Sequence, residues 1–240
     1  MPICKRIRRK NALIQIRCNI NKENSTLIAI KSTVSSDIEE EMSHNVELKS
    51  LRLVFIPEFL AEGCAIQNLT HPDRIVIGKS SDIDIKPLLQ LYHWIPIDSI
   101  IITSDKSAQI GKIASNAMLA QRISSINSLS ALCESYGAST TEVKNIIMAD
   151  HRIGKFQLQP SYGFGGSCFK KDVLALVYLS EKAGLKEVAT YWKSVLDMND
   201  FQMKRLSKKI IDVCEHKYII CIIGAAYKAG VSDFRESPTM

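Results

Sequence analysis

The spacing of hydrophobic positions changes part-way along the 240-residue chain. In the first half, short apolar runs are separated by polar stretches, a pattern typical of buried strands. The runs are Leu27–Ile30, Leu51–Phe55, Ile75–Ile77 and Ile100–Ile102. Helices are predicted between them, near Ser35–Met42 and Ile85–Tyr92. Strands that alternate with helices predict an α/β domain with a parallel sheet.

From Ala108 onward the spacing becomes helical. Apolar residues recur at steps of three and four, at Ile113, Ala117, Ala120, Ile123, Ile126, Leu129 and Cys133. This stripe predicts one long amphipathic helix that ends near Gly137. Ser139 and Glu142 have the spacing of a capping box, which predicts a shorter helix through Met148.

The rest of the chain is predicted to be a loop, two helices and a strand. Arg152–Gly166 holds four glycines and a proline, as loops do. Helices are predicted at about Lys171–Ala183 and Glu187–Cys214. The apolar run Tyr218–Ile223 precedes Gly224, as the first buried strand of a doubly wound domain would. No second strand follows, and no G-x-G-x-x-G precedes the first run, so we expect the sequence to be an incomplete form.

Composition and charge narrow the functional classes. The chain is 46% hydrophobic and 23% charged, in the ordinary globular range, and no run reaches the roughly 18 apolar residues of a membrane span. Seven cysteines without a C-x-x-C pair favour reduced thiols, a cytoplasmic location and no metal site. The net charge of +6 points weakly to an anionic partner such as a nucleotide diphosphate. The basic block from Lys5 to Lys10 is most simply a solvated tail, with a localisation signal or nucleic-acid contact as alternatives. We expect no nucleic-acid partner and no membrane.

Candidate chemistry lies in three pairs of polar residues that share a spacing of four. The pairs are Glu58 with Glu62, Lys112 with Asn116, and Cys168 with Asp172. Residues at this spacing lie on one face of a helix, so each pair should point into one pocket. Each pair is predicted near a helix N-terminus, where free N–H groups favour anions. For the first pair, the helix start is predicted from Pro57.

Cys168 is the strongest candidate for a reactive group. It follows the glycine loop Gly163–Gly166, and Ser167 is a plausible N-cap. A cysteine in the first turn of a helix, beside Lys170 and Lys171, favours the thiolate form, which is the nucleophile. Glycines before it let another molecule approach the backbone. A lone cysteine at a helix start is more often a small buried residue, but the neighbouring polar pairs favour a nucleophile.

Several segments resemble one enzyme family. Five stretches carry the likeness in unbroken order: Lys31–Val34, Pro57–Gly63, Lys112 with Asn116–Asn127, Gly163–Asp172, and Gly224–Ser237 with Tyr227, Lys228 and Arg235. They resemble the UDP-glucose/GDP-mannose dehydrogenase family, its UDP-glucose dehydrogenases most closely. The resemblance implies the NAD-dependent oxidation of the 6-hydroxymethyl group of UDP-glucose to a carboxylate, with two NAD and one water.

The resemblance also implies roles for individual residues. Cys168 would attack the intermediate aldehyde, and Lys112 with Asn116 would stabilise the oxyanion. Asp172 would assist proton movement, while Glu58 would act as the base for hydrolysis and Thr33 would hold the water. Residues implied beside NAD are Ser32, Thr33, Val34, Glu62, Cys168, Phe169, Lys170, Lys171 and Arg235. Residues implied at the sugar nucleotide are Glu58, Phe59, Leu60, Ala61, Glu62, Lys112, Asn116, Arg152, Gln159, Gly163, Phe164, Gly165, Tyr227 and Lys228.

The implied architecture is α/β, with parts of two Rossmann-like domains around an all-helical dimerisation domain. The expected segments are a divergent or disordered basic N-terminus (1–26), the C-terminal part of an NAD-binding domain (27–107), a central helical catalytic domain (108–215) and the start of a truncated UDP-binding domain (216–240). A dimer-based homo-oligomer through the central helices is expected, with little activity from this chain alone. The alternatives are a sister activity on GDP-mannose or a UDP-N-acetyl sugar, or a non-catalytic dimerising fragment.

Overall fold

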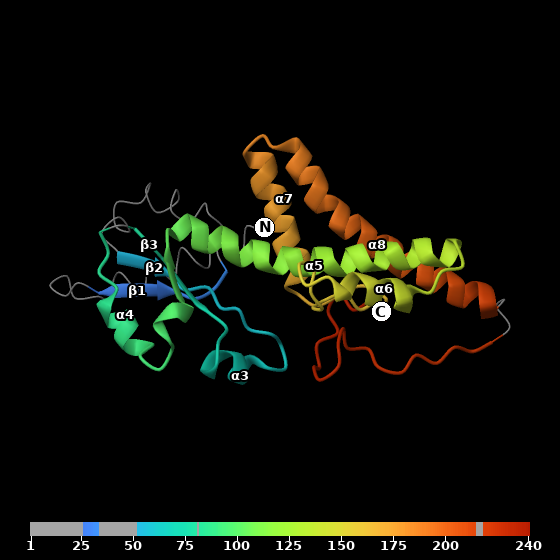
Figure 1. Ribbon diagram of the computed structural model, residues 1–240, viewed down its shortest axis with the longest axis horizontal. Helices are drawn as coiled ribbons and strands as arrows, with labels where there is room; N and C mark the ends of the chain where they lie inside the picture. Colours follow the sequence, from blue (N-terminus) through green and yellow to red (C-terminus); the bar gives the residue numbers. More distant parts are fainter. Residues whose placement is uncertain (1–25, 34–51, 81, 215–217) are drawn as a thin grey trace. The chain divides into compact units, whose positions relative to one another are not determined.

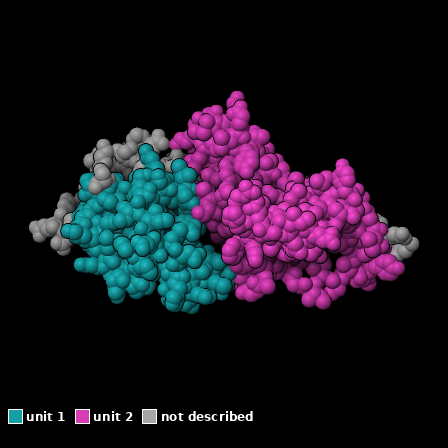
Figure 2. All heavy atoms as spheres, in the orientation of Figure 1, with its two compact units in different colours: residues 1–112 teal, residues 113–240 magenta. Residues whose placement is uncertain are grey.

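The computed structural model describes residues 26–33, 52–80, 82–214 and 218–240. The chain divides into two compact units, residues 1–112 and 113–240, which Figure 2 colours separately. The predicted helix near Ser35–Met42, the basic block Lys5–Lys10 and Val34 all lie outside the described residues. Among the described helices, none is both long and apolar enough to cross a membrane.

The first unit is built on a sheet with the strand order β1-β2-β3-β4 (Figure 1). Its strands are β1 (Leu27–Ile30), β2 (Arg52–Phe55), β3 (Ile75–Lys79) and β4 (Ile100–Thr103). Its shorter helices are α3 (Ala65–Thr70), α4 (Lys86–Leu91) and the 3-10 turn η1 (Ile97–Ser99). Side chains of β2 and of Ile56, the residue after it, alternate between two cores, with Leu53 and Phe55 in one and Val54 and Ile56 in the other. Strand β2 is therefore buried on both faces, as its continuous apolar run predicts, whereas Ile101 and Ile102 of β4 are exposed.

One feature of the predicted sheet is wrong. β1 pairs with β2 and β3 with β4 in parallel, but β2 pairs with β3 in the antiparallel sense, with Phe55 opposite Gly78. The connection between β2 and β3 contains only α3, a six-residue helix with no buried residue. A parallel crossover would need a helix that covers one face of the sheet. The sheet is therefore mixed.

The second unit is helical. Its elements are α5 (Asp105–Ser135, whose first residues belong to the first unit), α6 (Thr140–Ala149), α7 (Phe169–Lys182) and α8 (Lys186–Cys214). Helices α7 and α8 pack side by side as a hairpin (Figure 1). Ile113 and Ala117 of α5 pack with Val173 of α7 and Val195 of α8 in one core.

The helix starts follow local capping. The Glu142 N–H donates to Ser139 Oγ at 3.3 Å, so the predicted capping box of α6 is confirmed. Helix α5 begins at Asp105, three residues before the predicted start, because the Ser107 N–H donates to Ser104 Oγ at 3.1 Å. The predicted apolar stripe of α5 is largely buried within its own chain. That stripe is therefore not a free surface for a second copy, and the predicted oligomer stays a prediction.

The run Tyr218–Ile223 does not form the predicted strand. No described residue after Cys214 is in a strand, and these six residues are exposed. A strand exists only where a neighbouring backbone accepts and donates its ladder hydrogen bonds. No described strand pairs with this run.

Candidate active site

Cys168 lies at the start of α7, as predicted, but at the N-cap position and not in the first turn. It is the N-cap residue itself, with no side-chain capping bond, and its carbonyl accepts from the Asp172 N–H at 3.0 Å. The predicted N-cap, Ser167, lies one residue too early, although its hydroxyl is 3.9 Å from Cys168 Sγ. The thiol is exposed. It therefore meets solvent at the positive end of a 14-residue helix.

Asp172 lies one turn into α7 and is held from α5. Its carboxyl is 1% exposed, and its Oδ2 accepts from Asn116 Nδ2 at 2.6 Å. Its Oδ1 lies 3.3 Å from Lys171 Nζ, yet it accepts no hydrogen bond of good geometry from any described residue. A buried carboxyl oxygen without a full set of donors is an acceptor available for a proton or a water. The predicted partners Asn116 and Asp172 are thus brought together.

The glycine loop before Cys168 packs against the C-terminal segment. The Gly166 N–H donates to the carbonyl of Arg235 at 2.9 Å, and Lys170 Nζ lies 2.7 Å from Glu236 Oε2. The hydrogen bond that Lys170 donates to Glu236 raises the pKa of Lys170 above its ordinary value, against a smaller opposing effect of burial. The ring of Tyr227 fills the space in front of Gly166, about 3 Å from where a side chain would begin. The loop and residues 227–236 therefore form one packed cluster.

Substitution of Gly165 tests this packing. An added Cβ would lie 2.3 Å from the Glu236 carbonyl oxygen and 2.9 Å from the Tyr227 Cβ. Because backbone atoms block it, Gly165→Ala should destabilise the chain by about 1–3 kcal/mol and speed protease cleavage within residues 227–236. Gly111→Ala is the control, since Gly111 lies inside α5 and, apart from its chain neighbours and the adjacent turns of the helix backbone, no atom lies within 4 Å of its Cβ position. Denaturant unfolding with timed proteolysis measures both, and equal behaviour of the two variants would contradict the packing.

Four polar side chains to which the sequence analysis assigned no role hold the loop through hydrogen bonds to its backbone. Asn199 and Gln202 of α8 and Asn127 of α5 are buried, and Arg122 of α5 is half-buried. Arg122 donates to the carbonyls of Phe156 and Ile153 at 2.7 and 3.0 Å, and Asn127 Oδ1 accepts from the Ser161 N–H at 2.8 Å. The sequence could have indicated such residues as polar positions on the buried face of an amphipathic helix. Asn199, for example, lies four residues after Val195 and therefore on the same buried face.

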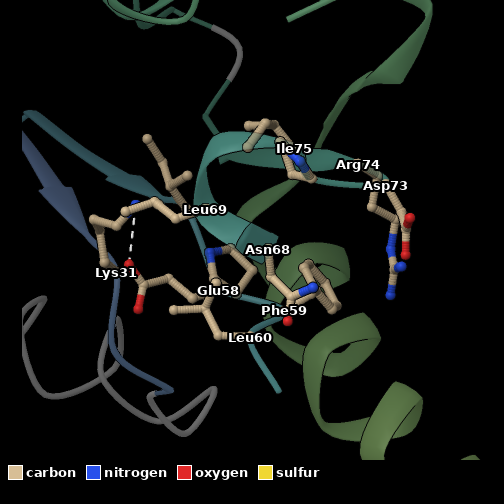
Figure 3. A pocket seen from close by; sticks show the side chains of 12 residues that line it. Lys31, Glu58, Phe59, Leu60, Asn68, Leu69, Asp73, Arg74 and Ile75 are labelled. Carbon is tan, nitrogen blue, oxygen red and sulfur yellow. Dashed lines mark ion pairs between the residues drawn. The ribbon is translucent and has the colours of Figure 1, made fainter. Parts of the chain in front are cut away.

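In the first unit, Lys31 and Glu58 face one another at the carboxyl ends of β1 and β2. Ile30 lies opposite Phe55 in the parallel pair, so the residues after both strands are neighbours. Figure 3 shows the two side chains pointing together, with Lys31 Nζ 3.2 Å from Glu58 Oε1 and also 3.2 Å from the Tyr92 hydroxyl, to which it donates. Burial alone would lower the pKa of Lys31, but Tyr92 and Glu58 together raise it above the ordinary value. Lys31 is therefore a cation at neutral pH beside the Glu58 carboxylate.

Phe59, the next residue, carries two cations over its ring. The guanidinium of Arg74 lies 3.9 Å from the ring centroid, and Lys112 Nζ lies 5.1 Å from it. Lys112 is 9% exposed. Positive charge over an aromatic face is favourable, so the ring helps to place both side chains. Together with Glu58, these residues form a charged site at the edge of the sheet.

Two of the three predicted pairs lack the predicted geometry. Residues after Pro57 are not helical, because the Ala61 N–H donates to the Asn68 side chain at 2.9 Å and the chain turns at Gly63. Glu58 and Glu62 therefore do not share a helix face. Lys112 lies on α5, but seven residues after its start at Asp105, so the argument from free N–H groups at a helix N-terminus does not apply to it.

The remaining predicted residues lie at the surface or beside these clusters. Ser32 and Thr33 follow β1. Leu60, Ala61 and Glu62 form the exposed connection after Phe59. Arg152 pairs with Asp150, whose oxygens it contacts at 2.5 to 3.2 Å, and this bond lowers the pKa of Asp150. Gln159 accepts from Lys144 at 3.0 Å, and Lys228 Nζ lies 5.9 Å from the Tyr227 ring.

Two family models match this chain. The NAD binding domain of the UDP-glucose/GDP-mannose dehydrogenase family matches residues 9–95, and the central domain of the same family matches residues 106–201. The chain belongs to the UDP-glucose/GDP-mannose dehydrogenase family. The family match starts at residue 9, ahead of Lys31, the first residue of the stretches that carry the resemblance. Lys31 and Glu58 lie in the matched NAD binding domain, while Asn116, Cys168 and Asp172 lie in the matched central domain.

Relatives within this dehydrogenase family are similar over most of the chain. UDP-glucose 6-dehydrogenase of Gallus gallus is 44% identical over 92% of this chain, and UDP-glucose 6-dehydrogenase 1 of Arabidopsis thaliana is 42% identical over 91%. The chain spans about half the length of these relatives, 47% and 48%. Among solved structures, a UDP-glucose dehydrogenase of Pyrobaculum islandicum has a TM-score of 0.78 at 30% identity, covering 89% of this chain and 50% of that one.

Proposed function

We propose that this chain carries the catalytic residues of an NAD-dependent dehydrogenase that oxidises UDP-glucose to UDP-glucuronate. The observation that carries the proposal is the exposed Cys168 at the N-cap of α7, one turn before the buried Asp172 that Asn116 holds. A thiol at a helix N-terminus is placed to act as a nucleophile, and a buried acceptor beside it is placed to move a proton. The likeness to relatives named UDP-glucose 6-dehydrogenases supports the substrate.

The proposed chemistry assigns each group one step. Cys168 Sγ adds to the aldehyde carbon of the once-oxidised sugar, and Lys112 with Asn116 stabilises the oxyanion that forms. Loss of hydride from that carbon leaves a thioester on Cys168. Glu58 then removes a proton from a water held near Thr33, the water attacks the thioester carbon, and the Cys168 thiolate departs. Asp172 exchanges protons with water during these steps.

Residues that follow β1 and β2 are proposed to bind one end of the dinucleotide NAD. Thr33 and Glu58 follow the carboxyl ends of the parallel strands β1 and β2, the edge at which open α/β sheets bind ligands. NAD bound there would supply the hydride acceptor for each of the two oxidations. Lys31 keeps a positive charge at this edge, beside Glu58. Ser32 and Thr33 offer hydroxyl groups, and Glu62, Phe169, Lys170, Lys171 and Arg235 are proposed to complete the contacts.

Assembly and location are part of the same proposal. We assign a homo-oligomer built on the central helices, with Met118 and Leu132 of α5 among the exposed apolar side chains available for it. The five described cysteines are all free, which supports a reducing compartment such as the cytoplasm. A sister activity on GDP-mannose or a UDP-N-acetyl sugar is the competing assignment. Comparing NADH formation from each sugar nucleotide distinguishes the enzymes, while dimerisation without any turnover would identify a non-catalytic module.

Alkylation of the thiols tests the nucleophile without any need for turnover. Cys64, Cys168 and Cys221 are all exposed, so accessibility alone predicts similar rates for the three. We expect Cys168 to react with iodoacetamide several-fold faster near neutral pH, because it caps a 14-residue helix, whereas Cys64 caps only the six-residue α3 and Cys221 lies in no described helix. Mass spectrometry of each cysteine over a pH series measures this. A rate at Cys168 no higher than at Cys64 and Cys221 would remove the nucleophile from the proposal.

A further inference from the structure

A buried amide on α8 holds the backbone of the glycine loop. Asn199 is 5% exposed, its Oδ1 accepts from the Phe164 N–H at 2.8 Å, and its Nδ2 donates to the Phe164 carbonyl at 3.0 Å. These bonds satisfy both main-chain groups of one loop residue, as a neighbouring strand would. Gln202, one turn further along α8, donates to the Ser161 carbonyl at 2.8 Å. The loop is therefore fixed by side chains of α8 at two points.

The backbone of the glycine loop is in close contact with the side-chain amide of Asn199. Gly163 has φ of +132°, and an added Cβ would lie 2.9 Å from Asn199 Oδ1. Only a glycine allows both the dihedral angle and the close approach. The loop and Asn199 are thus matched to one another at a site where no other residue would fit.

The position of Phe164 determines how the chain enters α7. Its side chain is 6% exposed and packs edge-on against the ring of Phe169, with centroids 5.8 Å apart. Phe169 is the first residue of α7, directly after Cys168. Contacts therefore run from Asn199 to Phe164 and from Phe164 to the first turn of the helix on which the thiol lies.

We infer that Asn199 is a positioning residue for Cys168, which keeps the thiol aligned with the N-terminus of α7. The inference rests on the proposed function, in which Cys168 is the nucleophile. Asn199 acts through the loop and contacts neither the thiol nor a substrate. Loss of its two hydrogen bonds would free the Phe164 backbone and let the first turn of α7 shift, and shifts of this kind strongly reduce the reactivity of an aligned group.

The test compares two Asn199 variants with a matched control in the 240-residue chain. Asn199→Ala removes both bonds, and Asn199→Asp keeps only the acceptor for the Phe164 N–H. Ser124→Ala is the control, because Ser124 is 4% exposed and donates its hydrogen bond to the Val195 carbonyl of α8, at 2.7 Å, and not to the loop. Iodoacetamide rates at Cys168, Cys64 and Cys221 are measured by mass spectrometry, with circular dichroism to confirm folding.

We expect Asn199→Ala to reduce the rate advantage of Cys168 over Cys64 by about fivefold, the size of a helix N-terminus effect. Asn199→Asp should give an intermediate loss, and Ser124→Ala should keep the advantage. If Asn199→Ala does not fold, Asn199→Asp carries the test. An unchanged or larger advantage in a folded Asn199 variant would overturn the inference but leave the proposed function standing. A wild-type chain without any advantage at Cys168 would instead overturn the proposed function, and this inference with it.

Discussion

Replacing Cys168 with serine should abolish steady-state NADH formation from UDP-glucose in a form of the chain extended at both ends to the length of its relatives. A serine hydroxyl at the N-cap of α7 cannot provide the thiolate that adds to the aldehyde, and no described residue offers a second thiol on α7. Removing the nucleophile of a covalent mechanism lowers the rate on the order of 10⁴-fold or more. The measurement is absorbance of NADH with UDP-glucose and NAD in excess.

Cys64→Ser is the matched control for that experiment. Cys64 is exposed like Cys168 and is also an N-cap residue, but of the six-residue α3 in the first unit. An exposed substitution away from packed contacts changes free energies by about 0.5 kcal/mol, so the rate should stay within about twofold. The 240-residue chain alone is expected to reach less than about a tenth of the extended form's rate, because binding energy from the remote nucleotide positions the reacting carbon. Steady NADH formation by the Cys168→Ser variant would show that another group is the nucleophile.

The parts of the fold that sequence reasoning could reach are those with a local cause. Ser139 and Glu142 predict α6 because the capping bond joins residues three apart, and the structure contains that bond. The stripe from Ile113 to Cys133 predicts α5 because helical spacing is a property of the segment itself. The place of Cys168 at a helix start could be predicted for the same reason, since the glycine loop and the helix start are formed by consecutive residues; its role as a nucleophile stays a prediction.

The features that sequence reasoning missed depend on contacts between segments that are distant in the sequence. Pro57 is a general signal for a helix start, but the N–H groups after it are used by a turn and by the Asn68 side chain. The antiparallel pairing of β2 with β3 depends on how their connection folds, which apolar runs alone do not specify. The sequence shows Asn199 as a polar residue on a buried helix face. Why it is polar becomes clear only from its hydrogen bond to Phe164 in the loop, 35 residues earlier. Positioning residues of this kind need the tertiary structure.

The second large effect expected is on stability, from Asn116. Its Nδ2 supplies the 2.6 Å hydrogen bond to Asp172 Oδ2, and Asp172 is 1% exposed. Asn116→Leu should lower the free energy of unfolding by about 3 kcal/mol, because it leaves a buried carboxyl oxygen without its donor while the other oxygen keeps only the Lys171 ion pair. Denaturant unfolding at constant pH measures the change.

A double-mutant cycle separates this hydrogen bond from a simple loss of packing. Asn116→Leu combined with Asp172→Leu removes both partners, and replacing both with apolar groups is far less unfavourable than stranding one. We therefore expect the double variant to be more stable than the sum of the two single changes predicts, by about 1–3 kcal/mol. Additive single changes would mean that the Asn116 amide does not support the Asp172 carboxyl. The placement of a proton acceptor one turn from Cys168 would then have to come from α7 alone, through Lys171.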